Sequence, residues 1–133
     1  DGYKPMKLTL PLRIPIAGRK DFILNLNNYR NSHHMILAEA KRNYTAVVWD
    51  LAKDLRPVGG LVKLRYEYFH SSSRKLDVAN PCSIIDKFTC DALTKAGIWG
   101  DDDTKTVREV SFAFGGVDKE NPRCDLFISK FFG

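Results

Sequence analysis

Apolar and polar residues alternate over two segments of the chain, and this period of two is typical of strands with one buried face. The first segment is residues 6–12 (MKLTLPL), where Pro11 indicates a strand near the end or the edge of a sheet. The clearest is residues 61–70 (LVKLRYEYFH), which has an apolar side and a charged side. Residues 107–114 and 123–131 complete the set of predicted strands.

Two further segments have apolar residues at spacings of three and four, which predicts helices. The first helix is expected over about residues 32–55, where a proline and two glycines end the pattern. The second is expected over about residues 81–96. Asn80 suits its N-cap, Pro81 its first helical position and Gly97 the stop at its C-terminus.

The order of these elements, β-α-β-α-β-β, predicts an α/β (α+β) fold, in which a small mixed β-sheet carries two main helices on one face. Residues 13–28 contain a proline, a glycine and several asparagines, so we expect a long loop there. Residues 115–122 (GGVDKENP) are expected to join the last two strands in a hairpin-like turn. No linker or repeat divides the chain, so residues 1–133 are expected to form a single domain, with residues 1–5 a tag or disordered.

The composition of the chain limits the class of protein and the kind of partner that can be expected. The chain of 133 residues is 44% hydrophobic and 28% charged, which is ordinary for a globular protein, and no apolar run is long enough to span a membrane. Its 3 cysteines give no even disulfide framework, which favours a reducing, cytoplasmic setting. The net charge of +5 favours an anionic partner, nucleic acid first, with ordinary solubility charge as the alternative.

The candidate chemistry lies around the second predicted helix. Asp77 precedes this helix, and Lys87 follows Asn80 by seven residues, nearly two turns, so that both lie on one helix face. Three adjacent aspartates follow the helix, and they repel one another unless a cation is bound. If the chain ran back along the helix in extended form, the first or second of them, Asp101 or Asp102, would approach Lys87 and Asp77.

Such a set suits phosphodiester chemistry. Carboxylate oxygens are the hard ligands that Mg²⁺ prefers, and the bound ion can activate a water and stabilise the leaving oxygen. A lysine can neutralise the charge that grows on the phosphate in the transition state. The alternative is structural: the three aspartates form a solvated turn, Asp77 is a charge favoured at a helix start, and Lys87 is the i,i+4 partner of Asp91.

The segments KLDVAN (residues 75–80) and IIDKFTCDALTKAGIWGDDDTKTV (residues 84–107) resemble the heart of the RusA-type Holliday junction resolvases, a family widespread in phages and prophages. The pattern of that family is Asp-x-Asp-Asn, a lysine on the following helix, Asp-x-Leu-x-x-x-Gly and a closing Asp-Asp. The segments KLTLPL (residues 7–12) and NLNNYRNSH (residues 25–33) are similar to its opening strand and its Asn-rich Tyr-Arg segment. The resemblance spans nearly the whole chain.

The resemblance implies a RusA-like crossover junction endodeoxyribonuclease, a homodimer that resolves four-way (Holliday) DNA junctions by paired nicks in recombination and repair. It implies Mg²⁺ as the cofactor, with Mn²⁺ as a substitute; no nucleotide cofactor and no membrane partner are expected. Asp77, Asp101 and Asp102 match the acids that bind the metal, and with Lys87, which matches the catalytic lysine, they are the predicted catalytic residues. The predicted DNA contacts are Tyr29, Arg30, Arg74, Lys75 and Asn80.

The sequence departs from the family pattern at one position, where Ala79 stands in place of the second acid of Asp-x-Asp. Losing a carboxylate weakens metal binding unless another acid replaces it, and the candidates are Asp86, Asp91 and Asp103. Two alternative functions therefore stay open. One is a catalytically weakened module that binds branched DNA, and the other is a phage nuclease that trims branched replication DNA.

Overall fold

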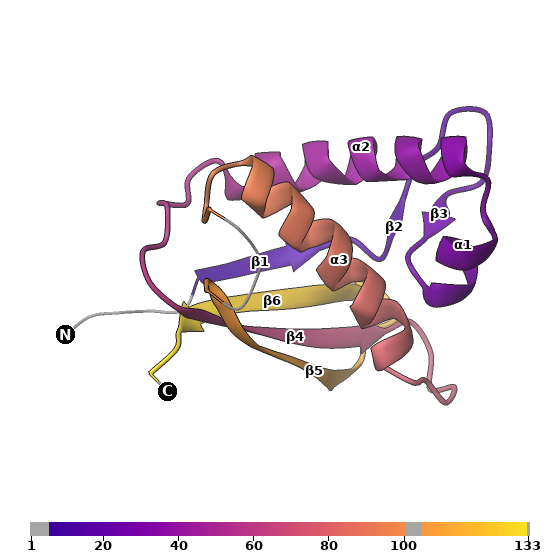
Figure 1. The fold of residues 1–133 in the computed structure, drawn as a ribbon. Coiled ribbons are helices and arrows are strands. Elements are labelled where there is room, and N and C mark those ends of the chain that lie inside the picture. Colours follow the sequence, from indigo (N-terminus) through magenta and orange to yellow (C-terminus); the bar gives the residue numbers. More distant parts are fainter. Residues whose placement is uncertain (1–5, 101–104, 133) are drawn as a thin grey trace.

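The computed structural model of the protein describes residues 6–100 and 105–132, which form three helices and two sheets (Figure 1). The main sheet has four strands in the order β1-β6-β4-β5. β6 is antiparallel to both of its neighbours, whereas β4 and β5 are parallel, so the predicted mixed sheet is confirmed. The strand bounds are Met6–Leu10 for β1, Val62–His70 for β4, Val107–Val117 for β5 and Arg123–Lys130 for β6.

β5 and β6 follow one another in the chain but are not neighbours in the sheet, so the predicted hairpin-like turn is wrong. β4 lies between them, and its residue Phe69 has Gly116 of β5 on one side and Arg123 of β6 on the other. The helix α3 (Ala79–Lys95) connects β4 to β5 and carries the chain back to the other end of the sheet, as parallel pairing requires. The connection from β5 to β6 therefore passes the end of β4.

The helices α2 (His34–Ala52) and α3 lie on one face of the main sheet, as predicted, and the core fills the space between the two layers (Figure 1). Tyr44 on α2 is fully buried, and its hydroxyl oxygen lies 2.9 Å from that of Thr89 on α3. Burial raises the pKa of Tyr44 far above its usual value, so the phenol stays neutral. A hydrogen bond inside the core thus joins the two helices.

The segment between β1 and α2, expected as a loop, contains short ordered elements, which corrects that prediction. β2 (Arg13–Ile14) and β3 (Phe22–Ile23) form a two-stranded antiparallel sheet, and α1 (Leu26–Asn31) follows them. The side chain of Asn25 caps α1, because it accepts a hydrogen bond of 2.8 Å from the backbone N–H of Asn28. The asparagines of this segment therefore start a helix.

The start of α3 also differs from the prediction, because its N-cap is Val78 and not Asn80. The carboxylate of Asp77 accepts a hydrogen bond of 3.1 Å from the backbone N–H of Ala79, which satisfies one of the donors that a helix start leaves free. Asn80 lies inside the first turn, and its side chain is available for another contact. Gly97, with a φ of 78°, lies just past the helix as predicted.

A stack of side chains on the opposite face of the sheet fixes the end of β5 against β4. The ring of Phe69 lies across Gly115, where an added Cβ would come within 2.7 Å of it. The guanidinium of Arg123 lies 4.0 Å from the centroid of the same ring and 2.8 Å from the carboxylate of Asp118. Hydrogen bonds from Asn121 and Arg123 lower the pKa of Asp118, which keeps this ion pair charged.

Candidate nucleic-acid interface and acidic hollow

An open hollow at the end of β4 contains three of the predicted site residues. Arg74, Lys75 and Asp77 line it from the segment between β4 and α3. Its apolar wall includes Phe114 and Val117 from the last part of β5. Asp77 is exposed, and its hydrogen bond to the backbone at the start of α3 holds the carboxylate beside the two cations. The parallel pairing of β4 with β5 brings these two segments together.

Asn80, one of the predicted DNA contacts, joins α3 to α1. Its side-chain oxygen accepts a hydrogen bond of 3.0 Å from the backbone N–H of Leu26, 54 positions away in the sequence. Leu26 is the first residue of α1, so Asn80 satisfies a donor that α1 itself leaves free. This bond holds α1 on the N-terminal part of α3 (Figure 1).

Tyr29 and Lys87, predicted from separate segments, meet between α1 and α3. The ammonium nitrogen of Lys87 lies 5.8 Å from the centroid of the Tyr29 ring, within the range of a cation–π contact. The Tyr29 ring packs edge-on against Phe88, with 6.3 Å between centroids. Lys41 of α2 approaches the same two rings, at 5.9 Å from Tyr29 and 5.7 Å from Phe88. Two ammonium groups thus lie against one half-buried tyrosine.

Lys41 is a candidate functional residue that the sequence did not reveal. The helical pattern places it beside Ala40, at the border of the buried face of α2, but does not say which part of the molecule that face meets. Among the described residues, no acid forms an ion pair with Lys41 or with Lys87. The two positive charges are therefore available to an anion. Arg30, also predicted to contact DNA, is exposed in the last turn of α1.

Basic and aromatic side chains continue from this cluster along the groove between α2 and α3. A shallow hollow there is lined by residues that include Lys41, Arg42, Trp49 and Lys95. Trp49 is 46% exposed, and its indole N–H donates a hydrogen bond of 2.8 Å to the carbonyl of Ala92 on α3. Cations that alternate with exposed rings are typical of surfaces that bind nucleic acid without reading its sequence.

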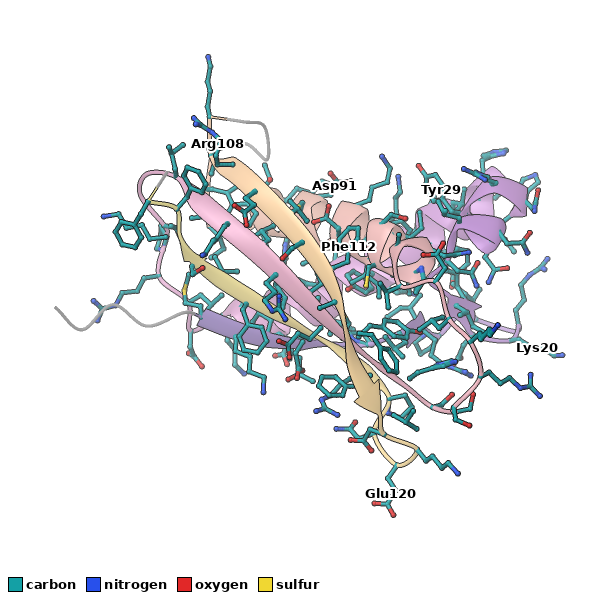
Figure 2. All side chains as sticks on the ribbon, turned by 90° about the horizontal axis from the view of Figure 1, so that it is seen from below. Lys20, Tyr29, Asp91, Arg108, Phe112 and Glu120 are labelled. Carbon is teal, nitrogen blue, oxygen red and sulfur yellow. The ribbon has the colours of Figure 1, made fainter. Side chains whose placement is uncertain are left out.

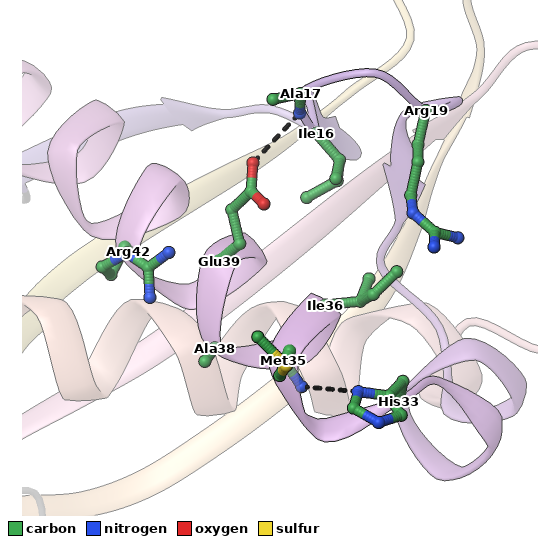
Figure 3. A pocket seen from close by; sticks show the side chains of 9 residues that line it. All are labelled: Ile16, Ala17, Arg19, His33, Met35, Ile36, Ala38, Glu39 and Arg42. Atoms are coloured by element: carbon green, nitrogen blue, oxygen red, sulfur yellow. Dashed lines mark hydrogen bonds between the residues drawn. The ribbon is translucent and has the colours of Figure 1, made fainter.

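Another hollow lies between α2 and the loop that follows β2 (Figure 3). Arg19, His33 and Arg42 line it, together with apolar side chains. Glu39 also lies there, but its carboxylate accepts a hydrogen bond of 3.0 Å from the backbone N–H of Ala17 and so fastens the loop to α2. This hollow contains none of the predicted site residues. Its two arginines extend the basic surface of the helical layer.

Asp101 and Asp102, two of the predicted metal ligands, lie outside the described residues. The described residues on both sides of them are held at the N-terminal end of β4, where the backbone N–H of Val62 donates to the carbonyl of Thr106 at 2.8 Å. A second bond of the same length joins the turn after α3 to the chain just before β4. Asp77 follows the other end of β4, a strand of nine residues that spans about 26 Å by the usual rise.

The acids that are candidates to replace the missing family carboxylate are in different environments. Asp86 is engaged inside the fold, because it accepts hydrogen bonds from the Tyr66 hydroxyl at 2.6 Å and from the Cys90 thiol at 3.2 Å. Asp91 is exposed on α3, one turn beyond the predicted catalytic lysine (Figure 2). Asp103 lies outside the described residues. Asp86 therefore has a structural role as a hydrogen-bond acceptor inside the fold, whereas Asp91 faces solvent.

The described residues define a basic, aromatic surface on the helical layer, next to a hollow with one exposed carboxylate. Within residues 6–100 and 105–132, no three His, Cys, Asp or Glu side chains gather as a group that could hold a metal ion. Compared with known protein families and with curated proteins, the chain matches no family model and no curated protein. Among the helices of the described residues, none combines the length and the apolar character that crossing a bilayer demands.

Proposed function

We propose that the protein is a Mg²⁺-dependent endonuclease that cuts four-way DNA junctions by paired nicks, acting in the cytoplasm as a homodimer like the RusA-type resolvases that it resembles. One observation carries the proposal: the hydrogen bond between Asn80 and Leu26, which holds α1 on α3, the helix that Asp77 precedes, where Tyr29 contacts Lys87. It supports a nuclease because a group that grips the phosphate backbone must lie near the acids that bind the metal.

The residues of the helical layer provide the contacts that bind DNA. Lys41 and Lys87 neutralise backbone phosphates on either side of Tyr29, whose hydroxyl and ring position the sugar and phosphate. Arg30 is on the same short helix as Tyr29 and extends this contact. Arg74 and Lys75 bind the DNA phosphates next to Asp77, in the hollow that these three residues line. Lysine and arginine contacts release counterions, so binding falls steeply as the salt concentration rises.

Asp77, Asp101 and Asp102 would hold the Mg²⁺ ion, for which Mn²⁺ can substitute. When bound, the ion supplies an activated water and stabilises the leaving oxygen of the cut strand. Lys87 then acts on the substrate alone: its charge offsets the negative charge that develops on the phosphate. Among the described residues, Asp77 is suited to this role because its carboxylate is exposed and is fixed by the N–H of Ala79.

The proposal is tested with a labelled four-way junction and a linear duplex of the same sequence, each incubated with Mg²⁺, with Mn²⁺ and with a chelator. We expect paired, metal-dependent nicks in the junction and none in the duplex. Cutting of both substrates at equal rates, or cutting that persists in the chelator, would contradict a structure-selective, metal-dependent enzyme.

The variant Asp102→Asn is expected to abolish cutting while junction affinity is unchanged or higher. The change removes a ligand of the metal and also a charge that repels phosphate. The matched control is Asp54→Asn, which alters an exposed carboxylate just after α2 and should cut at the parental rate. Cutting by Asp102→Asn at the parental rate would show that Asp102 is not a ligand.

A second candidate function is a module that binds branched DNA without cutting it. It is favoured by Ala79, which stands where the resembled family has an acid, and by Asp77 being the single carboxylate among the described residues that line the hollow. Tight, salt-sensitive binding of the junction with no nicks in either metal would support this module over the nuclease.

A further inference from the structure

β5 is an edge strand with an unusual composition. Among the described residues its only strand partner is β4, so the N–H and C=O groups of its other edge have no strand beside them. Soluble proteins usually protect such an edge with charges or proline. The opposite edge, β1, has Lys7 within it and Pro11 just after it. Residues 110–117 (VSFAFGGV) of β5 contain neither a charge nor a proline.

An apolar stripe follows the same stretch of β5. Val110, Phe114 and Val117 are 40%, 54% and 45% exposed. Their partners on β4 are Leu64, Tyr68 and His70, so these side chains point to the helical side of the sheet. Between them, Phe112 packs edge-on against Tyr66, with 5.7 Å between ring centroids, and lies beside α3 in Figure 2. The apolar stripe therefore continues the core onto a part of the sheet that α2 and α3 leave exposed.

We propose that the edge of β5 binds the β5 edge of a second copy of this chain, in antiparallel orientation about a two-fold axis at Phe112. This register sets Val110 opposite Phe114 of the second copy and Phe112 opposite itself, so each exposed apolar residue meets another. A chain of net charge +5 repels its copy, and the centre of the contact, residues 110–114, is uncharged. The two main sheets become one continuous sheet.

The pairing also places the hollow that contains Asp77 at the contact between the two copies. The same register sets Val107 of one copy opposite Val117 of the other, and Val117 lines the hollow that contains Asp77. Both hollows therefore lie at the interface between the copies. The inferred pairing rests on the proposed function in one respect, because paired nicking needs two subunits. The exposed edge of β5 supports the pairing independently of any activity.

The test measures the mass of the protein in solution by light scattering at several concentrations. We expect twice the chain mass of 15.1 kDa for the parent and the single chain mass for Val110→Lys and for Phe114→Lys, because each sets a charged ammonium group against an apolar side chain of the other copy. Thr9→Lys, on the exposed side of the opposite edge strand, is the matched control and should stay dimeric. Circular dichroism verifies that each variant is folded.

A second measurement tests the register. The three native cysteines are buried, so Phe112→Cys introduces the single accessible thiol and should give a disulfide-linked dimer on mild oxidation, whereas Lys7→Cys should not. A parent that is monomeric at every concentration, or a dimer that survives both lysine variants, overturns the inference. A dimer without nuclease activity rejects the proposed function alone, and a monomer that makes nicks rejects the pairing alone.

Discussion

Two aspartates, one just before α3 and one in its middle, show how a single residue's surroundings decide its role. Asp77 is exposed and lies beside Arg74 and Lys75, whereas Asp86 is held inside the fold by the hydroxyl of Tyr66. Burial, and next the electrostatic interactions with Cys90 and Asp86, raise the pKa of Tyr66 well above its usual value. The phenol therefore stays protonated and remains a hydrogen-bond donor. Asp86 is thus a structural acid.

The variant Tyr66→Phe is expected to lower the free energy of unfolding by about 1–3 kcal/mol, because it leaves the half-buried carboxylate of Asp86 without its shortest hydrogen bond. Junction binding by the folded protein should not change, because Tyr66 is fully buried. Urea denaturation followed by circular dichroism measures the loss. Tyr68→Phe, which removes a hydroxyl from the same face of β4, is the control and should destabilise less. An equal loss in both variants would contradict a specific role for Asp86.

At the level of elements, the site depends on how a very short helix is fastened to a long one. α1 has six residues and none of them is buried, so it cannot be held by packing alone. The hydrogen bond from the first N–H of α1 to Asn80, together with the contact of Tyr29 with Phe88, fixes it on α3. The position of Tyr29 in the proposed DNA surface is therefore set by a residue of another helix.

The variant Asn80→Ala is expected to loosen α1 and to weaken junction binding. Losing one part-buried hydrogen bond should cost about 1 kcal/mol, and binding should weaken by roughly fivefold, because the DNA must then order α1 itself. Hydrogen exchange at Leu26 to Tyr29 and the junction dissociation constant are the measurements. Asn80→Asp keeps the acceptor oxygen and should retain slow exchange. Equally fast exchange in both variants would show that the bond does not hold α1.

The elements that the sequence predicted well are those with one long face on the core. Alternation revealed β1 and β4; β5 and β6 were also predicted as strands, and the spacing of apolar residues revealed α2 and α3. These patterns did not reveal that β4 lies between β5 and β6, because sequence proximity favoured a hairpin. α1 was missed because its six residues contain only two apolar positions, Leu26 and Tyr29, which are too few to show a helical period. β2 and β3 were missed because they have two residues each.

In the candidate site, too, the groupings that depend on sequence proximity could be predicted, and those that depend on tertiary packing could not. Arg74, Lys75 and Asp77 share one hollow because they are close in the sequence, so their grouping could be predicted. A resemblance named Lys87 and Tyr29 separately, but it gave no physical reason for them to meet, so their contact was not predicted. Lys41 could not be predicted, because its place depends on how α2 packs on α3. Spacing along one helix encodes which residues share a face, but not the neighbour of that face.

At the scale of the whole molecule, the described residues next to the two acidic segments of the proposed site lie at opposite ends of β4. Thr106, which follows the three aspartates, is bonded to the N-terminal end of β4, whereas Asp77 follows the opposite end. Figure 2 shows the same separation, with Arg108 near the start of β5 at the opposite end of the molecule from Tyr29. Antiparallel pairing of two β5 strands would set the start of one beside the hollow of the other. A site that uses both acidic segments is therefore expected to combine the two copies.

Mixing two inactive variants tests this sharing of residues. If Asp77 of one copy acts with Asp102 of the other, a dimer of one Asp77→Asn chain and one Asp102→Asn chain has one site with both aspartates intact and one site with neither. Each variant alone should be inactive, and the mixture should regain metal-dependent single nicks in the junction after the subunits exchange. Mixing Asp77→Asn with Asp77→Ala is the control, since no pairing of those chains restores an intact site. Inactivity of the first mixture, with subunit exchange verified, would mean that each site belongs to a single copy, because only then does every dimer of the two variants lack a complete set of acids.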